Sequence, residues 1–165
     1  MREIEFRGKS LVTNNWVYGN YIIDKWGDSN NEIIYGILQD RTAPDYLKNW
    51  IPVRINPNTV GQYAGLKDKN GNKIFEGDIV KVFGMIGTVS SQCGSFGIDF
   101  YNCVDYEKLD NFTQKRTGSN FNGVCCDNFI SLYEIYWNLN NLDDCLYKVE
   151  IVGNKYDNPE LLKVE

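Results

Sequence analysis

The chain has 165 residues with 17 basic and 22 acidic side chains, which gives a formal net charge of −5. Apolar residues make up 42% and charged residues 24% of the chain, which is ordinary for a globular protein and excludes disorder throughout. Histidine is absent, which removes the commonest general base, the Ser-His and Cys-His nucleophile pairs and most catalytic zinc sites.

The N-terminal third predicts short strands. Ile4 and Phe6 alternate with charged residues, as in a half-buried strand. The stretches 16–23 and 32–38 are rich in β-branched and aromatic residues, and turn-forming residues 28–31 between them favour a hairpin. Thr42 is a candidate N-cap for one helical turn. Prolines 52 and 57 bracket an irregular stretch, so residues 1–58 are expected to form an N-terminal β-hairpin subdomain.

The clearest local signal lies at Asn70-Gly71. This pair is favoured in a type I′ turn, where both central residues have positive φ, and it predicts a hairpin that sets Asp68 opposite Lys73 and Leu66 opposite Phe75. The segment 68–72 also resembles the start of an EF-hand loop. Calcium is rejected because Lys73 and Ile79 stand where that loop needs Gly and Glu.

The segments 78–83, 86–89, 95–100 and 147–151 follow as short strands separated by glycines and turns. In 95–100 the residues alternate, so Phe96, Ile98 and Phe100 are expected inside and Gly97 and Asp99 outside. Their rhythm predicts a mainly β protein whose residues 59–165 form an SH3-like small barrel after the hairpin subdomain. Residues 102–130 are expected to be an irregular insertion. Ser131 and Glu134 fit a capping box for a helix that continues through Leu142, and Asn158-Pro159 suggests a final cap, so one or two short helices are expected.

Charged and thiol groups give no catalytic pattern. Cys125-Cys126 is the only close cysteine pair and lacks the CxxC spacing of a zinc knuckle. Asp143-Asp144 and the Asp105, Glu107 and Asp110 group could serve acid–base or magnesium chemistry, but a solvated face explains them better. A phosphate-binding glycine motif is absent. We therefore expect no enzymatic activity, no cofactor and no bound metal.

No segment reads as a signal peptide or as the roughly 18 apolar residues of a membrane span. The odd number of cysteines, five, suggests reduced thiols. A cytoplasmic protein that does not bind membranes is expected.

Two binding functions remain. The favoured one is contact with a protein partner, which could be a second copy of the chain, through aromatic residues near turns: Trp26, Trp50, Tyr101 and Trp137. The alternative is nucleic-acid binding, with aromatic rings stacking on bases and lysines meeting phosphates, although the acidic balance disfavours it. The predicted binding residues are Lys67, Lys69, Lys73, Lys81, Tyr101 and Trp137.

Five segments together resemble the YopX family: MREIEFRGK at 1–9, WVYG at 16–19, TVGQYAGLKDKNG at 59–71, IFEGDIV at 74–80 and VGNKYDNPELL at 152–162. The resemblance implies an SH3-type barrel in the C-terminal region and an origin in phages or prophages of low-GC Gram-positive bacteria. The expected location is then the cytoplasm of the bacterial host. The family implies no established activity, and no functional residues can be carried over from it.

Overall fold

The computed structural model describes residues 3–24, 33–38, 52–92, 94–101, 104–118, 120–121, 125–126, 128–139 and 149–162. Several predictions made above fall outside these residues: the turn at 28–31, the Thr42 cap, Trp26, Trp50, Asp143-Asp144 and the start of the last strand. The side chain of Trp137 is not described either.

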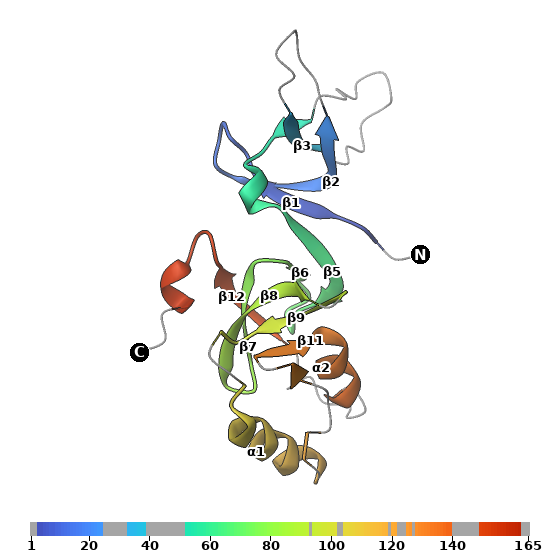
Figure 1. Cartoon of the computed structure of the whole chain (residues 1–165), viewed down its shortest axis with the longest axis vertical. Coiled ribbons are helices and arrows are strands. Elements are labelled where there is room, and N and C mark those ends of the chain that lie inside the picture. The colour runs from blue at the N-terminus through green and yellow to red at the C-terminus, as the bar shows by residue number, and fades with distance from the viewer. Residues whose placement is uncertain are drawn as a thin grey trace. The chain divides into compact units, whose positions relative to one another are not determined.

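The chain divides into two compact units, Met1–Gly65 and Leu66–Glu165. The boundary falls inside strand β5 (Gly61–Lys67), whereas the sequence placed it just before this strand, between residues 58 and 59. Two antiparallel sheets account for most of the helix and strand residues that the structure describes (Figure 1), so the mainly β prediction is confirmed.

The first unit contains β1 (Phe6–Lys9), β2 (Trp16–Asp24), β3 (Ile34–Leu38), β4 (Val53–Arg54) and the short helix η2 (Pro57–Thr59). In their sheet these strands have the order β4-β3-β2-β1, followed by β5 and then by β6 (Lys73–Phe75), which belongs to the second unit. The predicted pairing of β2 with β3 is confirmed, with Tyr21 opposite Ile37.

Alternation along these strands turns Val17 and Ile37 to one face, where they pack with Ile55 as the core of the first unit. Gly8 lies opposite Val17 in the β1–β2 pairing. A Cβ atom at Gly8 would come within 2.6 Å of the Ile55 side chain, so only glycine lets this core close. A bridge between Ser10 and Ile55 then joins the end of β1 to the residue after β4.

The second unit contains β6 (Lys73–Phe75), β7 (Asp78–Val82), β8 (Met85–Gln92), β9 (Ser95–Asp99), β10 (Cys125–Cys126), β11 (Phe129–Ser131) and β12 (Glu150–Asn154). Its sheet has the order β10-β11-β9-β8-β7-β12. This open antiparallel sheet is consistent with the small barrel-like fold that the sequence predicted. Its core includes the fully buried aliphatic side chains of Ile79, Val80, Val89, Ile98 and Ile130.

The prediction that residues 102–130 are irregular is wrong, because this stretch holds helix α1 (Tyr106–Thr117), strand β10 and the start of β11. Asp105 caps α1 by accepting a hydrogen bond from the Lys108 amide at 2.9 Å, and Gly118 ends it with φ +72°. Phe112 of α1 packs edge-on against Phe83 with ring centroids 5.4 Å apart. The helix is therefore docked on the β7–β8 turn.

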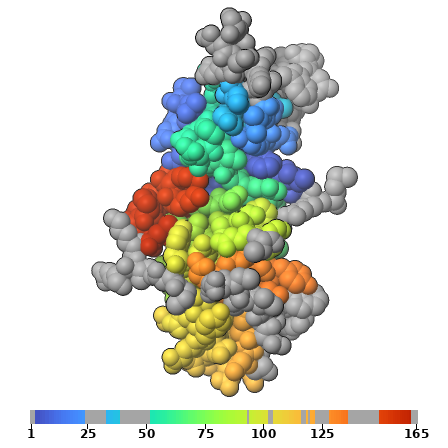
Figure 2. Space-filling view, in the orientation of Figure 1, coloured from blue at the N-terminus to red at the C-terminus, as the bar shows by residue number. Residues whose placement is uncertain are grey.

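The predicted N-cap at Ser131 is confirmed. The Ser131 hydroxyl accepts a hydrogen bond from the Glu134 amide at 3.1 Å and begins helix α2 (Leu132–Leu139). The predicted cap at Asn158-Pro159 begins a short 3-10 helix, η4 (Pro159–Leu162). Figure 2 shows the segment from β12 to η4, in red, on the surface of the second unit.

Candidate interaction surfaces

The hairpin at Asn70-Gly71 is present, but its turn is not type I′. Only Gly71 of the pair has positive φ, at +86°. The Asp68 amide donates to the Asn72 carbonyl at 2.8 Å, and the Gly71 amide donates to the Asp68 carbonyl at 3.0 Å. The loop therefore has three residues, with glycine in the left-handed position, and Asp68 lies opposite Asn72. The predicted register, with Asp68 opposite Lys73, is wrong.

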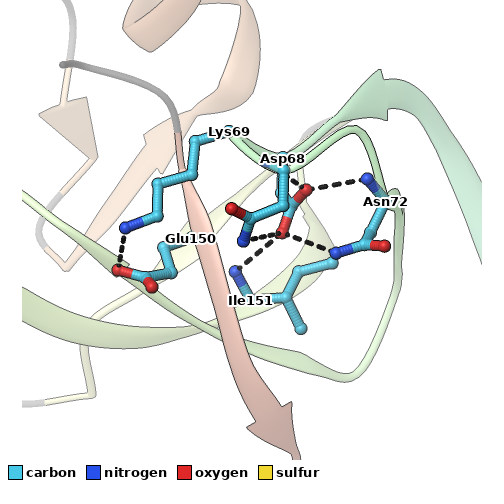
Figure 3. Close-up of polar contacts among 6 residues, drawn as sticks. Asp68, Lys69, Asn72, Glu150 and Ile151 are labelled. Carbon is cyan, nitrogen blue, oxygen red and sulfur yellow. Dashed lines mark hydrogen bonds and ion pairs between the residues drawn. The ribbon is translucent and has the colours of Figure 1, made fainter. Parts of the chain in front are cut away.

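The Asp68 carboxylate explains this longer loop (Figure 3). Its Oδ1 atom accepts hydrogen bonds from the amides of Asn70 and Asn72, at 2.9 and 2.8 Å. Its Oδ2 atom accepts one from the Asn72 side chain at 3.2 Å and one from the Ile151 amide of β12 at 3.4 Å. The Asp68 side chain, at the start of the segment that resembles a calcium loop, therefore joins the hairpin to β12.

The pKa of Asp68 reflects two opposing causes. Burial, which leaves only 2% of the residue exposed, raises the pKa of the carboxyl group. Hydrogen bonds from Asn72, from the Asn70 amide and from the Ile151 amide lower it. The hydrogen bonds prevail, so the pKa of Asp68 lies below its ordinary value and the group is a carboxylate at neutral pH.

The four predicted lysines all come from this hairpin and from β7, and Glu150 accompanies Lys69 and Lys81. Lys69 forms an ion pair with Glu150, with Nζ and Oε2 2.6 Å apart (Figure 3). Glu150 also lies opposite Lys81 in the pairing of β12 with β7. The pairing of Asp68 with Asn72 places Lys67 and Lys73 opposite each other on β5 and β6.

Tyr101, another predicted residue, has an unusual backbone. Its φ is +63°, a left-handed value that a bulky side chain rarely adopts. Its amide donates to Asp99 Oδ1 at 2.8 Å, and its hydroxyl donates to Thr88 Oγ1 at 2.9 Å. Asp99 also accepts a hydrogen bond from the Asn128 side chain at 2.7 Å. These hydrogen bonds hold Tyr101 in place, although 50% of the residue is still exposed.

Ile86 extends this aromatic position into a small surface. It lies two residues before Thr88 on β8, on the same side of the strand, and is 44% exposed. It is also opposite Lys81 in the pairing of β8 with β7. We call Ile86, Thr88, Asp99 and Tyr101 the Tyr101 surface. It combines the exposed side chains of Ile86 and Tyr101 with the polar side chains of Thr88 and Asp99, which are hydrogen-bonded to Tyr101.

A second exposed apolar position was missed by the sequence analysis. Leu11 and Val12, in the β1–β2 loop, are 63% and 88% exposed. The signal that could have predicted this exposed position is an aliphatic pair directly before the turn-forming residues 13–15. We call residues 10–15 the Leu11–Val12 tip, and it is the blue loop between β1 and β2 in Figure 1.

Two of the other candidate acidic groups serve the fold. Asp105 caps α1, and the pKa of its carboxyl lies below the ordinary value because it accepts a hydrogen bond from the Lys108 amide. Asp110 accepts one from the Phe121 amide at 3.2 Å. Cys125 and Cys126 pair with Ile130 and Phe129 of β11. Within the described ranges, no three His, Cys, Asp or Glu residues gather as ligands for a metal ion.

The model of the YopX protein family matches residues 5–163, which is nearly the whole chain. The chain belongs to the YopX family. The comparison with curated proteins gives no match.

Two solved structures are similar to the chain. Protein EF1440 from Enterococcus faecalis is 22% identical, with a TM-score of 0.47, over 99% of this chain and 100% of that chain. Protein yopX from Bacillus subtilis is 15% identical, with a TM-score of 0.44, over 100% of this chain and 99% of that chain. In the part of this YopX chain that the structure describes, no helix has the length and apolar character of a membrane span.

Proposed function

We propose that this YopX-family chain is a non-catalytic accessory protein of a phage or prophage that works in the bacterial cytoplasm by binding another protein. Membership of the family supports the setting. The contact itself is proposed on one observation, the strained and half-exposed Tyr101.

A tyrosine in the left-handed region costs of order 1–3 kcal/mol, and such strain gathers at functional sites. The hydrogen bonds to Thr88 and Asp99 hold the ring in one orientation before any partner arrives. A rigid aromatic side chain loses little conformational entropy on binding, so it is well suited to anchor an interface. Ile86 supplies an apolar neighbour for the same contact.

The charge distribution favours a protein partner over nucleic acid. A phosphate-binding face needs cations whose charge is available. Glu150 forms an ion pair with Lys69 and lies opposite Lys81, so it reduces the positive potential beside two of the four predicted lysines. The net charge of −5 also disfavours the approach of a nucleic acid, and it acts over longer distances.

Replacement of the ring tests the proposal. The full chain is used to capture partners from Bacillus subtilis cells, and the affinity of the captured protein is then measured for purified variants. Tyr101→Ala is expected to weaken binding about 30-fold, the size of an interface hot spot. Tyr133→Ala, at another exposed tyrosine on α2, is the matched control and should bind like the unmodified chain.

Equal binding by Tyr101→Ala and Tyr133→Ala would contradict the proposal, provided that both variants unfold at the same temperature as the parent. Tyr101→Phe separates the ring from its hydrogen bond. It should lose only part of the affinity, because the ring remains but Thr88 no longer holds it.

A further inference from the structure

The pair Asn70-Gly71, in the turn of the β5–β6 hairpin, carries a chemistry of its own. An asparagine followed by glycine is the dipeptide that loses its side-chain amide most readily in water, because glycine has no Cβ atom to hinder attack by its backbone nitrogen. The same dipeptide occurs once more, at residues 122–123, outside the described residues. The surroundings of Asn70 therefore decide whether the reaction takes place in the folded hairpin.

Both residues of the pair are open to solvent. Asn70 and Gly71 are exposed, and a Cβ atom added at Gly71 would meet nothing within 4 Å beyond the adjacent residues. Water, the other reactant, therefore reaches the pair. Asn72 is exposed directly after the same loop, but it is followed by Lys73, whose side chain hinders the same attack. Asn72 thus provides an internal comparison.

The reaction needs no group other than water. The backbone nitrogen of Gly71 gives up its proton to solvent and attacks Cγ of Asn70. The new C–N bond closes a five-membered succinimide ring, and the side-chain nitrogen of Asn70 takes up a proton and leaves as ammonia. Water then opens the ring at either carbonyl and leaves aspartate or isoaspartate. One water is consumed and one ammonia is released, with no oxidation or reduction.

Asp68 holds both reacting groups. The Gly71 amide donates to the Asp68 carbonyl at 3.0 Å, so the proton that must leave is engaged in a hydrogen bond. The Asn70 side chain donates to Asp68 Oδ2 at 3.5 Å, and the Asn70 amide donates to Oδ1 at 2.9 Å. These bonds must open before the nitrogen can reach Cγ, so the folded hairpin slows the reaction relative to a free peptide.

The product is incompatible with these contacts. A carboxylate at position 70 cannot donate to Asp68, and it places a second negative charge beside the first. Isoaspartate also inserts one more carbon atom into the main chain of a three-residue loop. Asp68 accepts the Ile151 amide at 3.4 Å (Figure 3), and the Lys69 amide donates to the Val149 carbonyl at 2.9 Å. Both contacts join the hairpin to the β12 segment, so both weaken when the loop changes.

We propose that Asn70 is a site of spontaneous deamidation, that Asp68 limits its rate, and that the product loosens the hairpin from β12. The chain would then carry a slow, irreversible change in its own second sheet. The inference goes beyond the proposed function and does not depend on it, because no partner takes part in the reaction.

Mass spectrometry of the full chain tests the reaction. The chain is kept at neutral pH and digested with trypsin, which separates residues 70–73 from residues 122–123. Asn70 is expected to exchange its NH₂ for OH, with isoaspartate among the products, about tenfold more slowly than in a free peptide of residues 66–75. Asn72 in the same fragment should stay unchanged.

Two variants test the role of Asp68. Asp68→Asn is expected to deamidate at Asn70 about tenfold faster than the parent chain. Lys69→Ala, in the same turn, removes only a solvent-exposed ion pair and should react like the parent. Thermal unfolding shows that both variants are folded at the temperature of the incubation. If Asp68→Asn does not fold, the parent chain and the free peptide still decide whether the site exists.

Hydrogen exchange tests the consequence. Asn70→Asp reproduces the aspartate product, and Asn70→Ser is the control that changes the side chain without adding a charge. The Ile151 amide is expected to exchange about tenfold faster in Asn70→Asp than in Asn70→Ser. The proposal is overturned if Asn70 is unchanged in the parent when the free peptide has fully reacted, if Asp68→Asn reacts no faster than Lys69→Ala, or if the two Asn70 variants exchange Ile151 equally.

Discussion

Asp68 shows how one side chain can join distant parts of the chain. Its carboxylate binds the hairpin through Asn70 and Asn72 and also accepts the amide of Ile151, 83 positions later in the sequence. The hydrogen bonds that lower its pKa act on the ionised form, so they stabilise the folded state only while the group is charged.

Asp68→Asn is expected to lower the free energy of unfolding by about 1–3 kcal/mol at neutral pH, since an amide group cannot accept all of these bonds. Below about pH 4 the unfolded state binds the proton more readily than the folded state, because the pKa is lower in the folded state. Acid therefore removes the stabilising contribution of Asp68, and the difference between the parent and the variant should narrow.

Urea unfolding at neutral and acid pH measures both effects. Lys69→Ala is the matched control from the same turn. It removes a solvent-exposed ion pair and should change stability by less than about 1 kcal/mol. A parent–variant difference for Asp68→Asn that stays constant or grows in acid would show that the charge of Asp68 is not what stabilises the hairpin.

Strand β9 shows what alternation can predict for an element and what it cannot. The pattern of residues 95–100 predicts Ile98 inside, which is confirmed, and Gly97 outside, which is wrong. Gly97 is buried because the Phe129 ring of β11 lies against it. A period of two assigns residues to two faces, but it assumes that one of the faces meets water.

Gly97→Ala is expected to destabilise the second unit by about 1–3 kcal/mol or more, as overpacking does. The added Cβ atom would lie 2.2 Å from Phe129 Cζ and 2.6 Å from the Ile130 carbonyl oxygen, and the backbone atom cannot rotate away. Gly94→Ala is the control, because its Cβ atom meets open space and only the left-handed φ of +78° opposes it, at about 1 kcal/mol.

Thermal unfolding of the two variants gives the comparison. If Gly97→Ala is no less stable than Gly94→Ala, the contact of Gly97 with Phe129 is not as tight as the structure has it.

At the scale of the whole molecule, the balance of charge sets what the chain can approach. A net charge of −5 repels polyanions, and Glu150 accompanies lysines 69 and 81. We expect titration with single- and double-stranded DNA and RNA at low salt to show no salt-sensitive affinity. Glu150→Ala provides the matched comparison, since it leaves Lys69 and Lys81 without that carboxylate. Tight binding by the parent chain that weakens steeply with salt would favour the nucleic-acid alternative.

The sequence by itself determined features that depend on neighbours along the chain. Residue composition predicted β2 and β3, the spacing of glycines and turns predicted β7 and β8, and alternation predicted β9. The Ser131 capping box pattern predicted α2. All of these patterns act within a few residues. The exposed aromatic Tyr101 was also predicted, although its left-handed backbone was not.

Tertiary structure decided what depends on distant partners. The Asn70-Gly71 turn takes three residues because Asp68 bonds to its own hairpin and to β12. Helix α1 has little apolar periodicity and is docked through Phe83 of another turn. The Leu11–Val12 tip and the pairing of Lys69 with Glu150 likewise arise where segments far apart in the chain meet, and no local pattern carries that information.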